Sequence, residues 1–111
     1  MEPSIWVRFP VSPHTYILIF VNRILLRMFY VYVLLSEIDG NIYLGSTNDL
    51  RRRLLEHNSG KVPSTKTRRP FELRYYEAYS NEDEARKREA SLKKDGRALS
   101  QLKIRISKSL Q

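Results

Sequence analysis

The chain contains no cysteine among its 111 residues, which excludes disulfide bonds and thiolate metal sites. This fits a reducing compartment such as the cytoplasm. No apolar run is long enough to cross a bilayer, which takes roughly 20 consecutive apolar residues. The run from Tyr16 to Val21 is followed by Asn22 and Arg23, and no small-residue cleavage site marks a secretory signal. We therefore expect no membrane association.

Acidic residues are few beside the basic ones, at 12 against 20, which gives a formal net charge of +8 and a pI of about 10.0. Such an excess favours a polyanionic partner, because each neutralised phosphate releases condensed counterions. A basic surface that only aids solubility is the alternative. Clustering of the charge favours nucleic acid, and the clusters are Arg51-Arg52-Arg53, Lys61 to Arg69 and Arg86-Lys87-Arg88.

The chain changes character at Met28. Residues 1–27 include Pro3, Pro10 and Pro13 and show no structural period, whereas the pattern from Met28 onward is regular. A content of 41% hydrophobic residues is enough for a compact core, and 111 residues suggest one domain. We therefore predict a domain at 28–111. The extension at 1–27 is expected to be poorly ordered or to lie upstream of the true start.

The pattern beyond Met28 predicts two strands, a helix, a third strand and two further helices. The strand segments are rich in aromatic and β-branched residues, and the longer helix follows a capping sequence, Ser80-Asn81-Glu82-Asp83. This order, β-β-α-β-α-α, predicts an α+β fold with a small three-stranded, mainly antiparallel sheet flanked by helices. The predicted strands are 29–35, 42–46 and 72–79. The first helix ends near residue 57, the second ends near residue 94, and the third spans 98–107. Residues 61–70 form a basic loop.

The first two strands form a hairpin whose turn signal is Asp39-Gly40. A turn centred there places Ile38 opposite Asn41. Because side chains alternate along a strand, the register then decides which residues share a face. The residues expected on one face are Tyr32, Leu34, Tyr43 and Gly45.

Five polar side chains on these elements are of the kinds that phosphodiester cleavage requires. Tyr32 and Tyr43 share a predicted face, Arg53 and His57 lie one turn apart on the first helix, and Glu89 lies on the next helix. Hydrolysis needs an activated water, neutralisation of the charge growing on phosphorus, and an eased leaving oxygen. Phenols, a guanidinium, an imidazole and a carboxylate suit that task when a divalent cation assists.

Each of these residues also has a purely structural interpretation. Glu89 lies between Ala85 and Leu92 at helical spacing, so it should point toward the protein body. Its carboxylate could hold Mg²⁺ or Mn²⁺, or it could pair with Arg53 or a neighbouring lysine. The tyrosines could be ordinary sheet aromatics, since the chain has seven.

On these residues the chain resembles the GIY-YIG endonuclease family, and most of all its small stand-alone members. It is also similar to the N-terminal nuclease module of the bacterial excinuclease. The resemblance runs from about residue 28 to 107. Tyr30-Val31-Tyr32 corresponds to the first family motif and Tyr43-Leu44-Gly45 to the second, and the further matching positions are Arg53, His57 and Glu89.

The resemblance implies catalytic roles for Tyr32, Tyr43, Arg53 and His57, and a metal-binding role for Glu89. It implies one divalent cation, Mg or Mn, with no small-molecule cofactor. One phenol would help to deprotonate the water while the other orients it or a phosphate oxygen. The chain departs from some members at Ser46, where they have lysine, and their late asparagine has no clear counterpart beyond Gln101.

The resulting hypothesis is a metal-dependent endonuclease that acts on DNA in repair or recombination, with branched or damaged DNA among the candidate substrates. The alternative is a nucleic-acid-binding module on the same fold with weak or no catalysis. Contact with the phosphate backbone rather than with base edges is expected. The residues predicted to make that contact are Arg51, Arg52, Lys61, Lys66, Arg68 and Arg69.

Overall fold

A computed structural model describes residues 27–111 of the chain. The prediction for the N-terminal extension therefore falls outside the described residues, except at Arg27. No helix in the described part is long and apolar enough to cross a membrane. The elements are β1 (Phe29–Ser36), β2 (Ile42–Thr47), α3 (Leu50–Asn58), the short 3₁₀ helix η1 (Lys66–Arg68), β3 (Phe71–Tyr79), α4 (Glu82–Lys94) and α5 (Gly96–Arg105).

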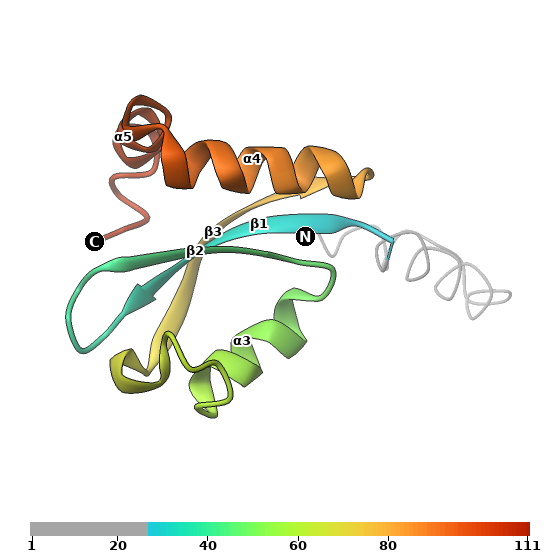
Figure 1. The fold of residues 1–111 in the computed structure, drawn as a ribbon. Helices are drawn as coiled ribbons and strands as arrows, with labels where there is room; N and C mark the ends of the chain where they lie inside the picture. The colour runs from blue at the N-terminus through green and yellow to red at the C-terminus, as the bar shows by residue number, and fades with distance from the viewer. Residues whose placement is uncertain (1–26) are drawn as a thin grey trace, which may run out of the picture.

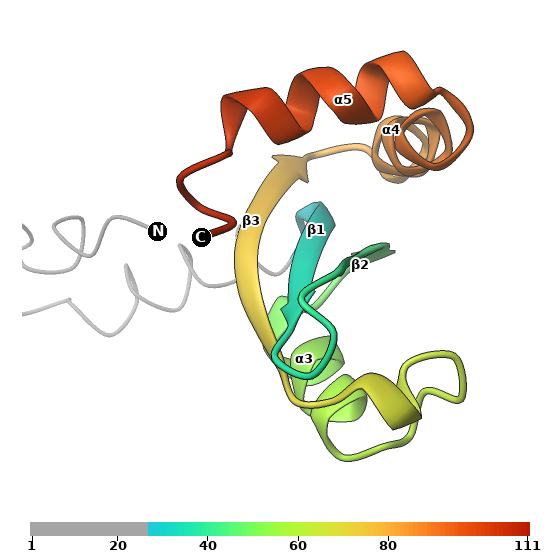
Figure 2. The ribbon, with the colours of Figure 1, turned by 90° about the vertical axis from the view of Figure 1, so that its left-hand side faces the viewer.

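The three strands form one antiparallel sheet in the order β2-β1-β3. Helices α4 and α5 lie over one face, and α3 lies against the other (Figure 1). The view along the sheet shows it curving between these two layers, with β1 in the middle (Figure 2). The predicted α+β class and its element order are confirmed. The central position of β1 also means that Tyr32 can contact groups from both neighbouring strands.

Each face of the sheet carries its own hydrophobic core. Because side chains alternate along β1, Val31 and Val33 pack toward α4 and α5, while Tyr32 and Leu34 pack toward α3. The α4 side is completed by Leu44, Ala85, Leu92, Leu102 and Ile106. The α3 side is completed by Phe71, Tyr43, Leu50, Leu54 and Leu73.

The predicted face-sharing of the two tyrosines is confirmed, although the predicted turn is wrong. Tyr32 pairs with Gly45 and Leu34 pairs with Tyr43, so all four residues share the α3 face. The strands close through a four-residue loop, with the Ser36 N–H donating to the Asn41 carbonyl at 3.0 Å, rather than through Ile38 opposite Asn41. The two registers differ by two residues, and a shift of two leaves every side chain on the same face.

Side chains within the loop explain why it is longer than predicted. The Ser36 hydroxyl accepts hydrogen bonds from the N–H groups of Ile38 and Asp39, both at 3.2 Å, and the Asp39 carboxylate accepts from the Asn41 N–H at 2.9 Å. Gly40 has φ +69°, which glycine adopts without strain. These bonds satisfy the loop backbone and stabilise the four-residue form over a two-residue turn.

The helix starts follow from side-chain caps. Asp49 accepts from the Arg52 N–H, Asn81 from the Glu84 N–H, and Asp95 from the Arg97 N–H. The last of these starts α5 at Gly96, two residues before the predicted start at Ala98. The predicted start is late because it does not take Asp95 as the cap.

Candidate active site

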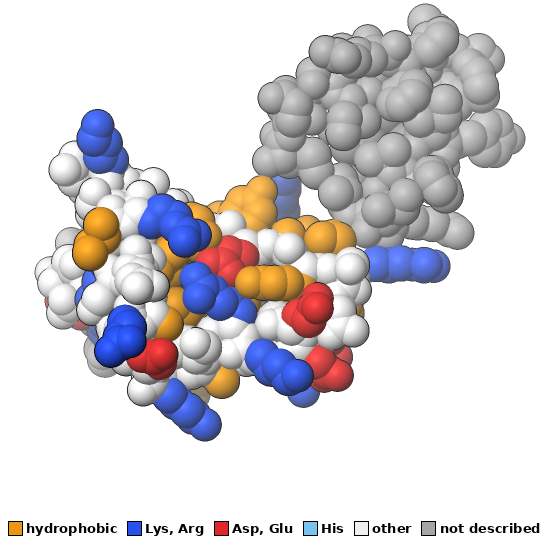
Figure 3. All heavy atoms as spheres, turned by 90° about the horizontal axis from the view of Figure 1, so that it is seen from above, with side chains coloured by type: hydrophobic (Ala, Val, Ile, Leu, Met, Phe, Trp, Pro, Cys, Tyr) orange, Lys and Arg blue, Asp and Glu red, His pale blue; other side chains and the backbone are white. Residues whose placement is uncertain are grey.

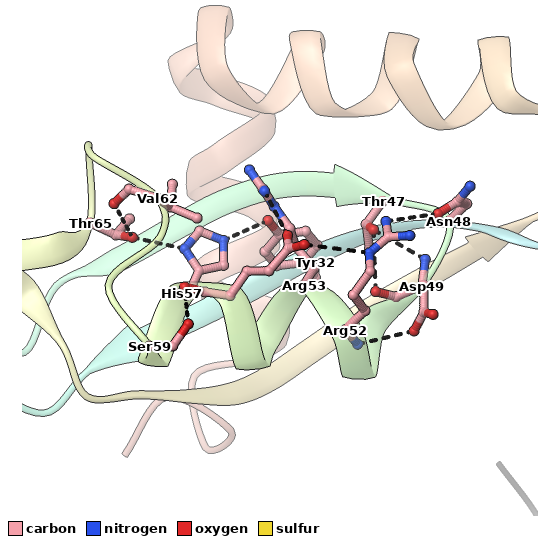
Figure 4. A network of polar contacts seen from close by, with 11 residues as sticks. Tyr32, Thr47, Asn48, Asp49, Arg52, Arg53, His57, Ser59, Val62 and Thr65 are labelled. Carbon is pink, nitrogen blue, oxygen red and sulfur yellow. Dashed lines mark hydrogen bonds and ion pairs between the residues drawn. The ribbon is translucent and has the colours of Figure 1, made fainter.

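A chain of buried polar groups links β1, α3 and the loop after it. The Tyr32 hydroxyl lies 2.9 Å from Nε2 of His57, and Nδ1 of His57 lies 2.8 Å from the hydroxyl of Thr65 (Figure 4). Tyr32 is 2% exposed, while His57 and Thr65 are fully buried. His57 reaches this position because it occupies the last turn of α3, on the same stripe as Leu50 and Leu54.

Either ring nitrogen of His57 can carry the proton, and the contacts of Thr65 favour the Nδ1–H tautomer. The Thr65 hydroxyl donates to the Val62 carbonyl at 3.4 Å, so its oxygen is left to accept from Nδ1–H of His57. Nε2 then carries the lone pair and accepts the proton of the Tyr32 hydroxyl. In this tautomer the imidazole is placed to receive a proton from the phenol.

Both partners are held neutral in the free protein. Burial raises the pKa of Tyr32, although hydrogen bonding from Arg53 opposes the shift. Burial lowers the pKa of His57, and the positive charge of Arg53 lowers it further. Full burial with both ring nitrogens engaged also leaves His57 no surface for direct phosphate contact, so proton relay is the function its position favours.

Arg53 lies on α3 beside this chain, with about a third of its side chain exposed. Its guanidinium donates a hydrogen bond to the Glu56 carboxylate at 3.0 Å and also hydrogen-bonds to the Tyr32 phenol. The ion pair with Glu56 spans one turn of an exposed helix face, where such pairs contribute only about 0.5 kcal/mol. A phosphate can therefore replace Glu56 at modest cost.

Tyr43 lies at the edge of the same aromatic cluster. Its ring centroid is 6.4 Å from that of Tyr32, 4.9 Å from that of His57 and 6.4 Å from that of Phe71. It is only half-buried, because β2 is an edge strand. The two phenols thus differ in access: Tyr43 reaches the surface, whereas Tyr32 is enclosed.

Gly45 makes room for Tyr32. A Cβ at this position would overlap the hydroxyl and the adjoining ring carbon of Tyr32 on the neighbouring strand. A glycine inside a strand often marks a bulge or a close approach by another group. The group that approaches is the phenol itself, and the β1–β2 pairing is regular at this point.

Glu89 approaches the edge strand from α4, on the other side of the sheet. Its Oε1 accepts from the Ser46 hydroxyl at 2.7 Å, and its Oε2 pairs with the Lys93 ammonium at 2.7 Å. The same ammonium lies 6.0 Å from the ring centroid of Tyr43. Of the structural alternatives for Glu89, pairing with a neighbouring lysine is observed, and pairing with Arg53 is not.

The basic residues predicted to contact phosphates do not behave as one group. Arg51 and Arg52 are exposed on α3, and Lys61, Lys66 and Arg69 are exposed in the following loop. Arg68 instead binds Asp39 at 2.6 Å and lies 5.4 Å above the ring centroid of Phe71. It fastens the loop to the hairpin. On the α4–α5 face, Lys and Arg side chains are spread among acidic ones rather than gathered in one patch (Figure 3).

A family model described as the GIY-YIG catalytic domain matches residues 28–103. The chain belongs to the GIY-YIG family. Among curated relatives, it is 48% identical over 65 residues to a UPF0213 protein of Bacillus pumilus, a stretch covering 58% of this chain and 65% of that protein. It is 43% identical over 65 residues to one of Staphylococcus epidermidis, covering 58% of this chain and 78% of that protein.

A UPF0213 protein of Streptococcus pneumoniae is 45% identical over 69 residues, which cover 61% of this chain and 69% of that protein. The chain therefore spans just under two thirds of the Bacillus pumilus relative and more of the other two. No solved structure gives a significant match. GIY-YIG membership supports a nuclease-type function.

GIY-YIG nucleases generally depend on a divalent cation, and the family resemblance assigns that cation to Glu89. Burial acts to raise the pKa of Glu89, but hydrogen bonds from Lys93 and Ser46 outweigh it, so the pKa lies below its ordinary value and the group is ionised. Residues 27–111 contain no cluster of three or more acidic or histidine side chains placed to hold a metal. A single carboxylate suits Mg²⁺ or Mn²⁺, which keep several waters.

The sequence alone does not identify Thr65 as a partner of His57, nor which neighbouring lysine pairs with Glu89. Thr65 sits in the basic loop, where no pattern marks it, and its contact with His57 depends on how 61–70 folds back. Lys93 is one helical turn after Glu89, an i,i+4 spacing that favours the ion pair. Ser46 departs in residue type from some members, yet its hydroxyl orients Glu89.

Proposed function

We propose that this protein is an endonuclease that hydrolyses phosphodiester bonds of DNA with one Mg²⁺ or Mn²⁺ ion held by Glu89. The observation that carries the proposal is the Tyr32–His57–Thr65 hydrogen-bond chain with Arg53 beside it. A buried phenol whose hydroxyl bonds an imidazole lone pair is an arrangement for moving a proton. The neighbouring Arg53 guanidinium can bind the phosphate and neutralise the negative charge that develops on it.

In this proposal Arg53 leaves Glu56 and binds two oxygens of the scissile phosphate. Tyr43, the less buried phenol, orients the attacking water at the surface. Tyr32 gives its proton to Nε2 of His57. Because Tyr32 is enclosed, the proposal requires substrate binding to open its oxygen to the water, and the phenolate then takes a proton from the water as the water attacks phosphorus and the bond to the departing oxygen breaks. The cation, when bound, shields the charge that develops on the phosphate and on the departing oxygen.

In the free protein, proton transfer from Tyr32 to His57 is unfavourable. With ordinary pKa values near 10 for tyrosine and 6.5 for histidine, moving the proton costs about 5 kcal/mol. Here burial raises the pKa of Tyr32 and lowers that of His57, so the cost is greater still. The proposal therefore requires positive charge brought in with the substrate complex to stabilise the phenolate, and activity should depend steeply on the cation.

A second candidate is a nucleic-acid-binding module that does not cut. One observation favours it: both carboxylate oxygens of Glu89 are already engaged, one by Ser46 and the other by Lys93. A cation must displace the ammonium before Glu89 can bind it. If this exchange is too costly, the basic surface would bind DNA in a salt-sensitive manner without cleavage.

The deciding experiment incubates the full chain with supercoiled plasmid and with linear, flap and branched DNA, with and without Mg²⁺ or Mn²⁺. Glu89→Gln should abolish cleavage while leaving DNA binding intact. The matched control is Glu84→Gln, which neutralises an exposed acid on the same helix and should cut normally. Metal-dependent cleavage by Glu89→Gln would overturn the single-cation assignment.

Two further results separate the remaining alternatives. DNA binding by the unmodified protein without cleavage of any substrate would establish the binding module. Preferential cleavage of flap or branched DNA over linear duplex would support a role in repair or recombination, and equal cleavage of all substrates would count against it.

A further inference from the structure

A pocket of about 260 Å³ opens beside the candidate active site, where the end of β2 lies between the first turns of α3 and α4. It shares two residues with the site. The Ser46 hydroxyl donates to the Glu89 carboxylate, and Arg53 hydrogen-bonds to the Tyr32 phenol. Both residues also line the pocket. The pocket therefore adjoins the place where the scissile phosphate would bind, and its remaining residues have no part in the chemistry proposed above.

The pocket wall is strongly basic. Three guanidinium groups line it, from Arg52, Arg53 and Arg86, against the single carboxylate of Glu82. Arg86 pairs with Glu82 at 2.9 Å and Arg52 with Glu56 at 3.7 Å, and more than half of each arginine side chain is exposed. Exposed pairs of this kind contribute at most about 1 kcal/mol. An anion whose oxygens are stronger acceptors can therefore take these arginines from their present partners.

The rest of the lining suits the other parts of a nucleotide. Phe29 and Tyr30 offer apolar and aromatic surface for a base or sugar, as in single-strand binding sites. Thr47 and Asn48 add hydroxyl and amide groups that can bond to phosphate or sugar oxygens. The volume is slightly below the roughly 300 Å³ of small-ligand sites, which admits one nucleotide and excludes a base pair.

We propose that this pocket binds one unpaired nucleotide of the substrate strand, next to the phosphodiester that is cut, with Arg52 and Arg86 on its phosphate. The inference rests on the proposed nuclease function and narrows it to strands that can offer an unpaired nucleotide at the cleavage point. The strand would run from the Glu89 edge across Ser46 into the pocket between α3 and α4. Gapped, flap or single-stranded DNA meets this requirement, and continuous duplex does not.

Binding is the direct test, because it can be measured without cleavage. The probe is fluorescent single-stranded (dT)₆, titrated against the full chain in a chelator so that no divalent cation is present. Arg52→Ala and Arg86→Ala should each weaken binding roughly tenfold, the loss expected for one guanidinium–phosphate contact. The matched controls are Arg97→Ala and Lys87→Ala, which remove the same charge from exposed helix positions outside the pocket and should weaken binding less than about threefold.

The outcomes distinguish this inference from the nuclease proposal. If Arg52→Ala and Arg86→Ala weaken binding no more than their controls, or if (dT)₆ does not bind, the pocket assignment is overturned even when cleavage is observed. If the arginine effects appear but no DNA is cut, the subsite is supported and the proposed activity fails. Equal arginine dependence for a blunt 12-base-pair duplex would overturn the requirement for an unpaired nucleotide. All four side chains are exposed, so loss of folding does not confuse the comparison.

Discussion

The Tyr32 hydroxyl and Nε2 of His57 lie 2.9 Å apart in the core between the sheet and α3, with the imidazole fully buried. A buried pair of this kind must keep its protons arranged to satisfy both groups, because an unpaired polar atom there costs about 1–3 kcal/mol. The contact is therefore part of the fold as well as of the proposed site. Changes at either residue should be measured for stability before they are interpreted as catalytic.

Lowering the pH should destabilise the folded protein through His57. Because burial lowers the pKa of His57, the unfolded chain binds a proton before the folded one does, so this residue stabilises the fold fully above about pH 6.5 and progressively less below it. By pH 5.5 the loss can reach at most about 1.4 kcal/mol. Urea unfolding at pH 7.5 and 5.5 should show a larger loss for the unmodified protein than for His57→Gln.

The same comparison has an internal control. His57→Gln keeps the chain's other histidine, His14, so the difference between the two proteins isolates His57. The carboxylates whose pKa is lowered, among them Glu77 and Glu89, titrate below this window. Equal acid sensitivity in both proteins would show that His57 is not held neutral.

The second prediction concerns Gly45. Because an added Cβ would overlap the Tyr32 hydroxyl, Gly45→Ala must push the phenol from its place or separate the strands. We expect a loss of about 1–3 kcal/mol in the free energy of unfolding, as in other overpacked cores. Gly96→Ala is the control, since a Cβ at Gly96 meets nothing within 4 Å and should be neutral or slightly stabilising. Thermal unfolding of both variants checks this, and equal melting temperatures would contradict it.

The third prediction concerns Glu77, which ties β3 to α4. Its carboxylate accepts from Tyr75 at 2.8 Å, Tyr79 at 2.6 Å and Arg88 at 3.0 Å. Burial and the bond to Glu77 raise the pKa of Tyr79 to about 12. Glu77→Gln leaves Arg88 without its charged partner, and we expect it to cost about 1–3 kcal/mol at pH 7.

The cost of Glu77→Gln should shrink in acid. Burial acts to raise the pKa of Glu77, but hydrogen bonds from Arg88 and the tyrosines outweigh it and hold the pKa below 4.5, so its stabilisation is present above that value and is lost as pH falls through the lower folded pKa. Urea unfolding at pH 7 and pH 3 measures this, with the exposed Glu72→Gln as control. A constant difference between the two pH values would mean that the carboxylate charge is not responsible.

The sequence predicts the α+β fold and the shared face of the tyrosines because both depend on local periodicity. Alternation along β1 and β2 fixes which side chains face α3, and it tolerates the wrong turn length because the error is two residues. The hairpin loop was mispredicted because its length is decided by the Ser36 and Asp39 side chains bonding to the backbone. Such bonds compete with the Asp-Gly turn signal at similar energy.

The candidate site was only partly predictable, for a related reason. Arg53, His57 and Glu89 stand out because they occupy set positions on helices, but their partners lie on other segments. Thr65 comes from a loop without a period, and no spacing rule connects it with His57. Burial of Tyr32 but not of Tyr43 depends on β2 being an edge strand, which requires the strand order β2-β1-β3.

The last prediction concerns Lys93 and the cation. The Lys93 ammonium lies 2.7 Å from Oε2 of Glu89. It weakens the binding of a divalent cation by Glu89, because it occupies the carboxylate and repels the cation. Nearly half of the Lys93 side chain is exposed, and such a pair contributes at most about 1 kcal/mol, so Lys93→Met should bind Mn²⁺ about two- to fivefold more tightly. Lys94→Met removes the same charge from the next, exposed position and should change affinity less, while Glu89→Gln should abolish binding at this site. Titration of Mn²⁺ followed by electron paramagnetic resonance measures affinity without DNA or cleavage. Equal affinities for Lys93→Met and Lys94→Met would show that the cation does not have to displace Lys93, and unchanged Mn²⁺ binding by Glu89→Gln would show that Glu89 is not its ligand.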